Sequence, residues 1–172
     1  MTFEPTDVDE MLRALAASPD RKRFEAFLRL GVDATSAVRR GLRDDDWRVR
    51  RDCLRFLDHH VDPESEAIAI ELLRGDPSPE VRKWAAHALG CDRCKGGADL
   101  ALDPVPALVE AARSDASLRV RRSAVVALAW TRPPDARIHA FLAELAAAER
   151  DPKLRRHAID GMARHASAPR DA

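Results

Sequence analysis

The 172-residue sequence contains no tyrosine, asparagine or glutamine, and it has only three cysteines. The N-terminus has neither a basic nor an apolar signal region, so we expect no secretory signal. Three cysteines in a chain without an export signal do not make a disulfide framework. The longest uninterrupted apolar run, residues 124–130, is far shorter than the roughly 20 residues of a membrane span. These absences exclude disulfide-rich secreted and membrane classes, and we expect a cytoplasmic protein with no membrane partner.

Net charge is also absent, because 29 basic residues balance 29 acidic ones. A zero net charge argues against a whole-molecule field for nucleic acid or an anionic membrane, although it leaves room for a local patch. Only four basic residues are lysine, which leaves 25 arginines, and alanine occurs 31 times, a bias typical of a GC-rich bacterial genome. With 45% apolar and 34% charged residues the chain can bury one core, which excludes disordered and collagen-like classes.

What the sequence does contain is a fourfold internal repeat. Four segments share a Val-Arg or Leu-Arg pair, and their starts are 32, 39 and 34 residues apart. They begin at Val49, Val81, Val120 and Leu154. The amphipathic stretches ahead of them cover about residues 34–43, 64–74, 104–113 and 135–149. Asp-Pro pairs at 62–63, 76–77, 103–104 and 151–152 predict helix starts with Pro just inside. No run alternates with a period of two, so we predict helix pairs joined by tight turns and no strand.

The apolar residues of each segment fall on one side of a helix. When the Val or Leu is counted as position 0, positions 0, +4, +5, +7 and +8 cluster at about 100° per residue. In the first segment these positions are Val49, Cys53, Leu54, Phe56 and Leu57. Position +4 holds small residues, which let stacked helices approach closely, so we expect Cys53 to be a small core residue. One pair cannot bury its apolar face alone, and stacking neighbouring pairs supplies a continuous core.

The pattern Asp-x-x-x-x-Val-Arg-x-x-Ala-x-x-Ala-Leu-Gly, which residues 76–90 match best, resembles the HEAT repeat family and especially its short bacterial HEAT-like, PBS-lyase-type branch. The resemblance covers about residues 33–165 and implies an all-α fold, a right-handed α-solenoid (alpha-alpha superhelix) in a single domain over 1–172. Solenoids of this family mostly bind other proteins. The expected parts are an atypical N-terminal pair at 7–31, repeats at 33–60, 62–90, 104–130 and 133–165, and a Cys-x-x-Cys insertion at 91–103.

The same resemblance implies a ladder of ion pairs between neighbouring repeats. In the family, the Asp of the turn usually pairs with the Arg that follows the Val, and a bidentate carboxylate offsets the desolvation of that Arg. Asp151 lies only three residues before Leu154, where the other turns have five, which indicates a shorter turn. The ladder residues implied are Asp44, Arg50, Asp76, Arg82, Asp115, Arg121, Asp151 and Arg155.

Positions +2, +3, +6 and +10 point away from the core and line one continuous surface in a solenoid. Position +2 is basic in every repeat, and two tryptophans and a valine lie beside that row. This combination is typical of a surface that binds an acidic, partly apolar protein. The alternative is a solvated arginine face with the tryptophans packed on neighbouring loops. The expected partner-binding surface consists of Arg51, Lys83, Trp84, Arg122, Val126, Trp130 and Arg156.

The interruption of the repeat contains the only Cys-x-x-Cys, Cys91 and Cys94. This motif resembles one half of a zinc knuckle, whose tight turn lets two thiolates bind one metal. His87 lies four residues earlier on the same helical face, and His59 is the repeat equivalent of Cys91. One interpretation is therefore a structural zinc site of Cys91, Cys94, His87 and His59. A redox dithiol, without the usual βαβ surroundings, and packing without chemistry are the other two.

No nucleophile elbow, Walker loop, zincin helix or Rossmann glycine pattern is present. Deoxyhypusine hydroxylase-like members of the superfamily carry iron on His-Glu pairs, and the sequence has no His-Glu dipeptide. Alkylpurine DNA glycosylase-like solenoids use a basic concave face with aromatics, but Asp52, Asp58 and Asp160 interrupt such a face here and argue against nucleic-acid binding. The sequence thus favours a non-catalytic protein-interaction scaffold. The alternatives are a metal- or thiol-dependent activity, or a lyase-like chaperone role, centred on Cys91 and Cys94.

Overall fold

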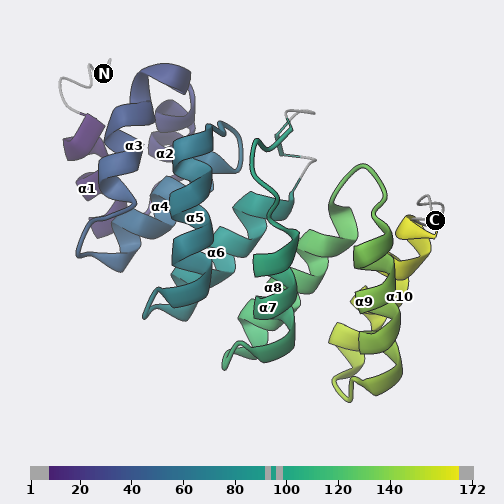
Figure 1. Cartoon of the computed structure of the whole chain (residues 1–172). Helices are drawn as coiled ribbons and strands as arrows, with labels where there is room; N and C mark the ends of the chain where they lie inside the picture. The colour runs from purple at the N-terminus through teal and green to yellow at the C-terminus, as the bar shows by residue number, and fades with distance from the viewer. Residues whose placement is uncertain (1–7, 92–93, 96–98, 167–172) are drawn as a thin grey trace.

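The computed structural model describes residues 8–91, 94–95 and 99–166, and within these ranges every regular element is a helix (Figure 1). None of these helices is long and apolar enough to cross a membrane. Their bounds are α1 (Val8–Ala17), α2 (Arg21–Leu28), the 3-10 helix η1 (Gly31–Ala34), α3 (Thr35–Gly41), α4 (Trp47–Leu57), α5 (Pro63–Gly75), α6 (Pro79–Gly90), α7 (Val105–Ser114), α8 (Leu118–Trp130), α9 (Ala136–Ala148) and α10 (Pro152–His165).

The helices pair and the pairs stack side by side, which confirms the expected α-solenoid (Figure 1). The first helices α3, α5, α7 and α9 form one layer, and the second helices α4, α6, α8 and α10 form the other. The second helices pack directly against one another along the whole stack. Their predicted core positions are buried: Cys53, Val81 and Ala85, for example, are fully inaccessible, which confirms Cys53 as a core residue.

Small residues set the spacing of the second layer. A Cβ added to Gly90 at the end of α6 would lie 2.3 Å from the Cβ of Ala127 and 2.6 Å from its Cα, both on α8. No side chain fits at that distance, so glycine is required for the close approach of the two backbones. The alanine richness of the chain has the same cause, because Ala85, Ala86 and Ala124 are fully buried between second helices.

Aspartates cap several helices, but not at every predicted Asp-Pro pair. Asp62 and Asp151 are N-caps with Pro as the next residue, and they accept hydrogen bonds from the amides of Ser65 and Leu154. The prediction is wrong at 76–77 and 103–104, since α6 begins at Pro79 and α7 at Val105. Asp76 lies in the turn and accepts from the amide of Ser78 at 2.8 Å. Its carboxylate is thereby left facing the preceding repeat.

The N-terminal pair packs differently from the others. Helix α1 packs on both α3 and α4, with Met11, Leu12 and Leu15 buried, so it takes the stacking position that second helices hold elsewhere. Helix α2 packs on α1 and reaches α4 through Phe27, whose ring centroid is 4.7 Å from that of Phe56.

Candidate functional site

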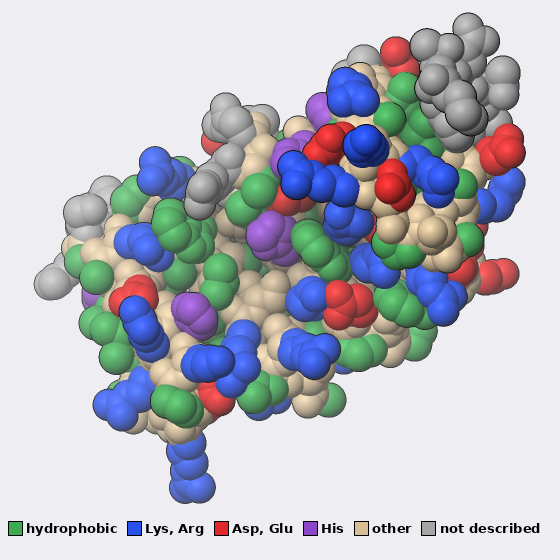
Figure 2. Space-filling model, turned by 180° about the vertical axis from the view of Figure 1, so that it is seen from behind, with side chains coloured by type: hydrophobic (Ala, Val, Ile, Leu, Met, Phe, Trp, Pro, Cys, Tyr) green, Lys and Arg blue, Asp and Glu red, His purple; other side chains and the backbone are tan. Residues whose placement is uncertain are grey.

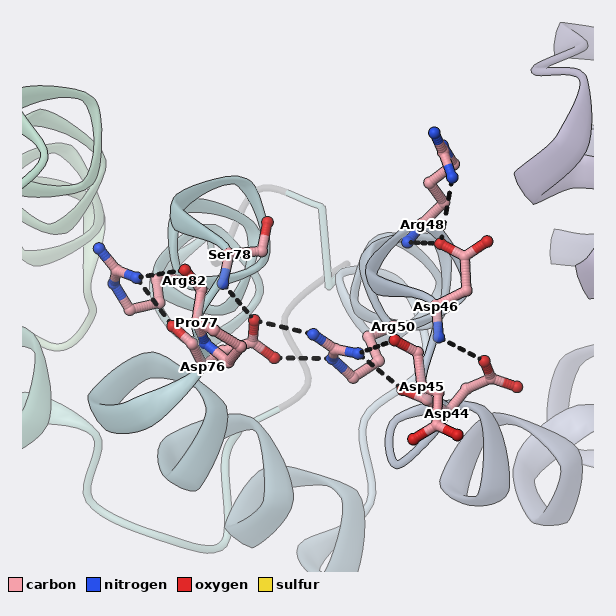
Figure 3. Close-up of polar contacts among 9 residues, drawn as sticks. All are labelled: Asp44, Asp45, Asp46, Arg48, Arg50, Asp76, Pro77, Ser78 and Arg82. Atoms are coloured by element: carbon pink, nitrogen blue, oxygen red, sulfur yellow. Dashed lines mark hydrogen bonds and ion pairs between the residues drawn. The ribbon is translucent and has the colours of Figure 1, made fainter.

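An arginine–aspartate ladder connects successive repeats (Figure 3). Arg50 donates from Nε and Nη2 to the two carboxylate oxygens of Asp76 at 2.7 and 3.0 Å, and from Nη1 to the carbonyls of Asp44 and Asp45 at 2.6 and 3.0 Å. Arg50 therefore binds the backbone of its own turn and the carboxylate of the next turn. The fork of donors on arginine satisfies both at once, which lysine cannot do.

The second step of the ladder repeats the first. Arg82 donates to both oxygens of Asp115 at 2.7 and 3.0 Å and to the carbonyl of Asp76 at 2.8 Å. Burial raises the pKa of Asp115, but the hydrogen bonds from Arg82 and from the Ser117 amide, together with the charges of Arg82 and Arg121, hold the pKa below its usual value. Asp115 is thus ionised at neutral pH, and the pair is charged.

The ladder changes register in its last step, contrary to the expected pairing. Among residues 8–91, 94–95 and 99–166, Arg121 makes a side-chain hydrogen bond only to its own turn, from Nη1 to the Asp115 carbonyl at 2.8 Å. Asp151 instead accepts hydrogen bonds from Arg122, from Nη2 at 2.7 Å and from Nε at 3.3 Å, and these bonds lower the pKa of Asp151. Arg155 is exposed. The short turn before α10 displaces Asp151 toward the helix, so it meets the arginine one residue further along α8.

The second helices line the face that Figure 2 shows, which is hollowed along its middle and has Lys and Arg interspersed with Asp and Glu. The expected basic row lies on these helices, but most of its members are paired. Arg51 donates to both oxygens of the buried Asp52 at 3.0 and 2.9 Å, and Lys83 pairs with Glu80. As far as the described residues go, Arg156 alone in this row is largely free: it is exposed and lies 3.9 Å from Asp160. The face therefore has less free positive charge than the sequence alone indicates.

Aromatic side chains on this face are flanked by cations. Trp84 on α6 is half-buried between Arg55 and Lys83, whose charged groups lie 5.6 and 5.5 Å from its ring centroid. Trp130 at the end of α8 is 39% exposed, and the guanidinium carbon of Arg164 lies 3.9 Å above its ring. Such cation–π pairs hold an exposed aromatic ring in place. A pocket of about 410 Å³ lies beside Trp130 and is lined by Ala129–Pro134 and Arg164. Val126, on α8 with Trp130, is half-buried.

Arg55 and Arg164 were not selected from the sequence, although the repeat places them at the outward positions +6 and +10. Their role is visible only in the contacts that they make with rings on neighbouring helices. Arg55 also lies 3.8 Å above the ring of Phe24 and binds Asp52 at 3.0 Å. The position of a residue in the repeat shows that its side chain faces outward, but not which aromatic ring it covers.

A second group lies where α4 and α6 end. One ligand atom from each of Asp58, His87, Cys91 and Cys94 lies within 4.8 Å of the others. His87, Cys91 and Cys94 were expected together, but His59 is not in this group: it is exposed, and Asp58 takes its place. The equivalence of His59 with Cys91 fails because α6 ends at Gly90 and Cys91 leaves the helical conformation. The remainder of the insertion, residues 92–93 and 96–98, lies outside the described residues.

The group, which we call the Asp58–Cys94 cluster, is polar, with Asp58 buried and the other three residues half-buried. Asp58 is 4% exposed; its Oδ2 lies 3.2 Å from Nε2 of His87, and its Oδ1 has no hydrogen-bond partner among the described residues. The sulfur atoms of Cys91 and Cys94 are 3.2 Å apart. Burial, together with the neighbouring Cys91 thiol and Asp58 carboxylate, raises the pKa of Cys94 to about 12. Buried Lys95 donates to the Cys91 carbonyl at 3.2 Å.

Comparison with known proteins agrees with this architecture. The family profile for HEAT repeats matches residues 35–103 and 67–163. A chain in the structure of the complex of CpcE and CpcF of phycocyanin lyase from Nostoc sp. PCC7120 has the same fold, with a TM-score of 0.73 and 21% sequence identity over 90% of this chain and 97% of that one. No curated protein matches the sequence. The repeat profile spans well over half of the chain and the helix pairs stack as a solenoid, so the protein belongs to the HEAT repeat family.

Proposed function

We propose that the protein is a non-catalytic interaction module that binds another protein on the face lined by its second helices. The observation that carries this proposal is the exposed ring of Trp130, which Arg164 covers beside a pocket where α8 ends. Tryptophan and arginine are the residues that contribute most often to the centre of protein interfaces. An ordered ring of this kind loses little conformational entropy when a partner covers it.

The contacts of the face also indicate the chemistry of the partner. Arg51, Lys83 and Arg122 already have intramolecular carboxylates, so long-range charge attraction contributes little. Arg164 covers the exposed ring of Trp130 and Arg156 is exposed on the same helix, so each can meet one carboxylate. We therefore expect a partner with apolar side chains for the Trp130 pocket and a few acidic residues around them. Binding of this kind weakens only modestly with salt, whereas phosphate-dominated nucleic-acid binding weakens steeply.

The structural neighbour supports the general class of function. Its structure is that of a complex between CpcE and CpcF, so a chain of this fold is compatible with binding to another protein. A lyase-like chaperone role would be a special case of such binding, in which the bound protein is a client. The scaffold role and the chaperone role both require that another protein binds the face lined by the second helices.

Affinity capture with quantitative mass spectrometry tests the proposal. We expect Trp130→Ala to reduce the captured partner at least about tenfold, since truncation of a central interface Trp costs about 2 kcal/mol or more. Arg164→Ala should give a smaller loss in the same direction. Arg74→Ala is the matched control, because Arg74 is an exposed, ion-paired arginine on α5 in the first layer. Equal capture by the wild type and Trp130→Ala, or an equal loss for Arg74→Ala, would contradict the assignment of the face.

A further inference from the structure

The Asp58–Cys94 cluster has the donor set and geometry of a tetrahedral zinc site. We propose that Asp58, His87, Cys91 and Cys94 bind one Zn²⁺ ion. This proposal does not depend on the partner-binding function, because the cluster lies apart from Trp130 and its pocket. It joins the ends of two neighbouring repeats, since Asp58 follows α4 while the other three residues are on or directly after α6.

The spacing of the donor atoms supports this assignment. Zinc lies about 2.3 Å from sulfur and about 2.0–2.2 Å from nitrogen or oxygen, so tetrahedral donors are separated by about 3.3–3.8 Å. The sulfur pair and the pair of His87 Nε2 with Asp58 Oδ2 are each 3.2 Å apart, and all four donors lie within 4.8 Å of one another. A tetrahedron requires the sulfur pair to open by about 0.5 Å and the longest separations to contract by about 1 Å. Rotation of the cysteine side chains supplies a movement of that size without a change in either helix.

The electrostatic surroundings favour a cation at this point. Helices α4 and α6 both end at the cluster, and the C-terminus of a helix carries partial negative charge. Within the described part of the chain the buried Oδ1 atom of Asp58 has no hydrogen-bond partner, an arrangement that is costly unless something else satisfies it. A divalent ion beside this carboxylate removes the cost.

The charges also balance when zinc is bound. Two thiolates and one carboxylate contribute three negative charges against the two positive charges of zinc. The ammonium group of the buried Lys95, which donates to the carbonyl of Cys91 at 3.2 Å, brings one positive charge beside the cluster. Binding therefore releases the two thiol protons to solvent, and affinity must increase with pH. Two soft sulfur ligands with one imidazole select zinc over the hard cations magnesium and calcium.

Cobalt(II) titration of the full chain, purified without a histidine tag and kept reduced, tests the proposal directly. Tetrahedral thiolate coordination of cobalt gives intense visible bands and a sulfur-to-metal charge-transfer band in the near ultraviolet. We expect both signals to saturate at one equivalent of cobalt and to disappear when one equivalent of zinc is added. A titration with neither signal would overturn the proposal. A Cys91–Cys94 disulfide in protein isolated under reducing conditions would also overturn it, and would support the redox interpretation.

Variants identify the ligands. Cys91→Ser and Cys94→Ser should each weaken zinc binding at least about 100-fold in competition with a chromogenic chelator, and Asp58→Asn should weaken it about 10- to 100-fold. His59→Ala is the matched control, since His59 is adjacent to Asp58 but exposed, and zinc affinity should not change. Circular dichroism confirms that each variant folds. Equal affinity for Asp58→Asn and the wild type, or a loss for His59→Ala, would refute the ligand set.

Discussion

Replacement of Arg50 with methionine tests the ladder at its most buried step. The side chains of Arg50 and Asp76 are 10% and 1% exposed, so the substitution leaves the Asp76 carboxylate inside the protein without its two charge-assisted hydrogen bonds. Removal of one partner from a buried ion pair costs about 3–5 kcal/mol, because the other charge stays desolvated. The carbonyls of Asp44 and Asp45 also lose a donor. We expect the free energy of unfolding to fall by about 3–5 kcal/mol.

Exposure predicts a gradient along the ladder. Arg122→Met removes a pair whose side chains are 32% and 22% exposed, and it should cost only about 1 kcal/mol or less. Arg82→Met should lie between the two, since Arg82 and Asp115 are 15% and 7% exposed. Urea unfolding at neutral pH, followed by far-ultraviolet circular dichroism, gives the three values. If Arg50→Met lowered the free energy of unfolding by no more than Arg122→Met, this account of the ladder would be refuted.

A double variant separates the two parts of the cost. In Arg50→Met with Asp76→Leu the orphaned carboxylate is gone, so most of the lost stability should return. The amide of Ser78 still loses the acceptor that Asp76 provides, which leaves a deficit of about 1 kcal/mol. A double variant less stable than Arg50→Met would show that Asp76 matters for a reason other than its charge.

Two further predictions concern packing and pH. Gly90→Ala should lower the free energy of unfolding by about 3 kcal/mol, because the new Cβ lies 2.6 Å from a backbone atom of α8. Gly75→Ala is the control: its Cβ meets nothing within 4 Å, so it should be neutral or stabilising by about 0.5–1 kcal/mol. The thermal unfolding midpoints of the two variants test this difference. Burial lowers the pKa of His165, which accepts the Asp135 amide hydrogen bond on Nδ1 and faces the Leu128 carbonyl with Nε2. The unfolded chain therefore binds the proton first as the pH falls below 6.5, and stability should fall by at most about 1.4 kcal/mol per pH unit. His165→Gln should flatten this dependence in urea midpoints between about pH 7.5 and about pH 5, and an unchanged slope would contradict the assignment.

The repeat itself could be predicted because it depends on local periodicity. Val81, Ala85 and Leu89 return to one side of α6 at helical spacing, and all three are buried. The same arithmetic places Cys53 in the core, where the structure has it. Each repeat carries this pattern independently, so a core position assigned in one repeat can be checked against the same position in the other repeats.

The pairing of charges across repeats depended on turn length. The alignment matched each arginine to an aspartate by column, which identifies the residues of the first two steps. At the last step the shorter turn before α10 places Asp151 against Arg122 and leaves Arg155 exposed. The alignment of the repeats cannot show this pairing, because a turn that is shorter by two residues presents its carboxylate to a different residue of the neighbouring helix.

The sequence by itself determined the all-α repeat, its buried positions and the proximity of His87, Cys91 and Cys94, since all of these depend on residues close together along the chain. Only the tertiary structure decided that Asp58 joins the cysteines in place of His59, and that Arg164 covers Trp130. Both contacts link different helices. They depend on where each helix ends and how it is rotated against its neighbour, which backbone packing across the stack decides and no single segment encodes.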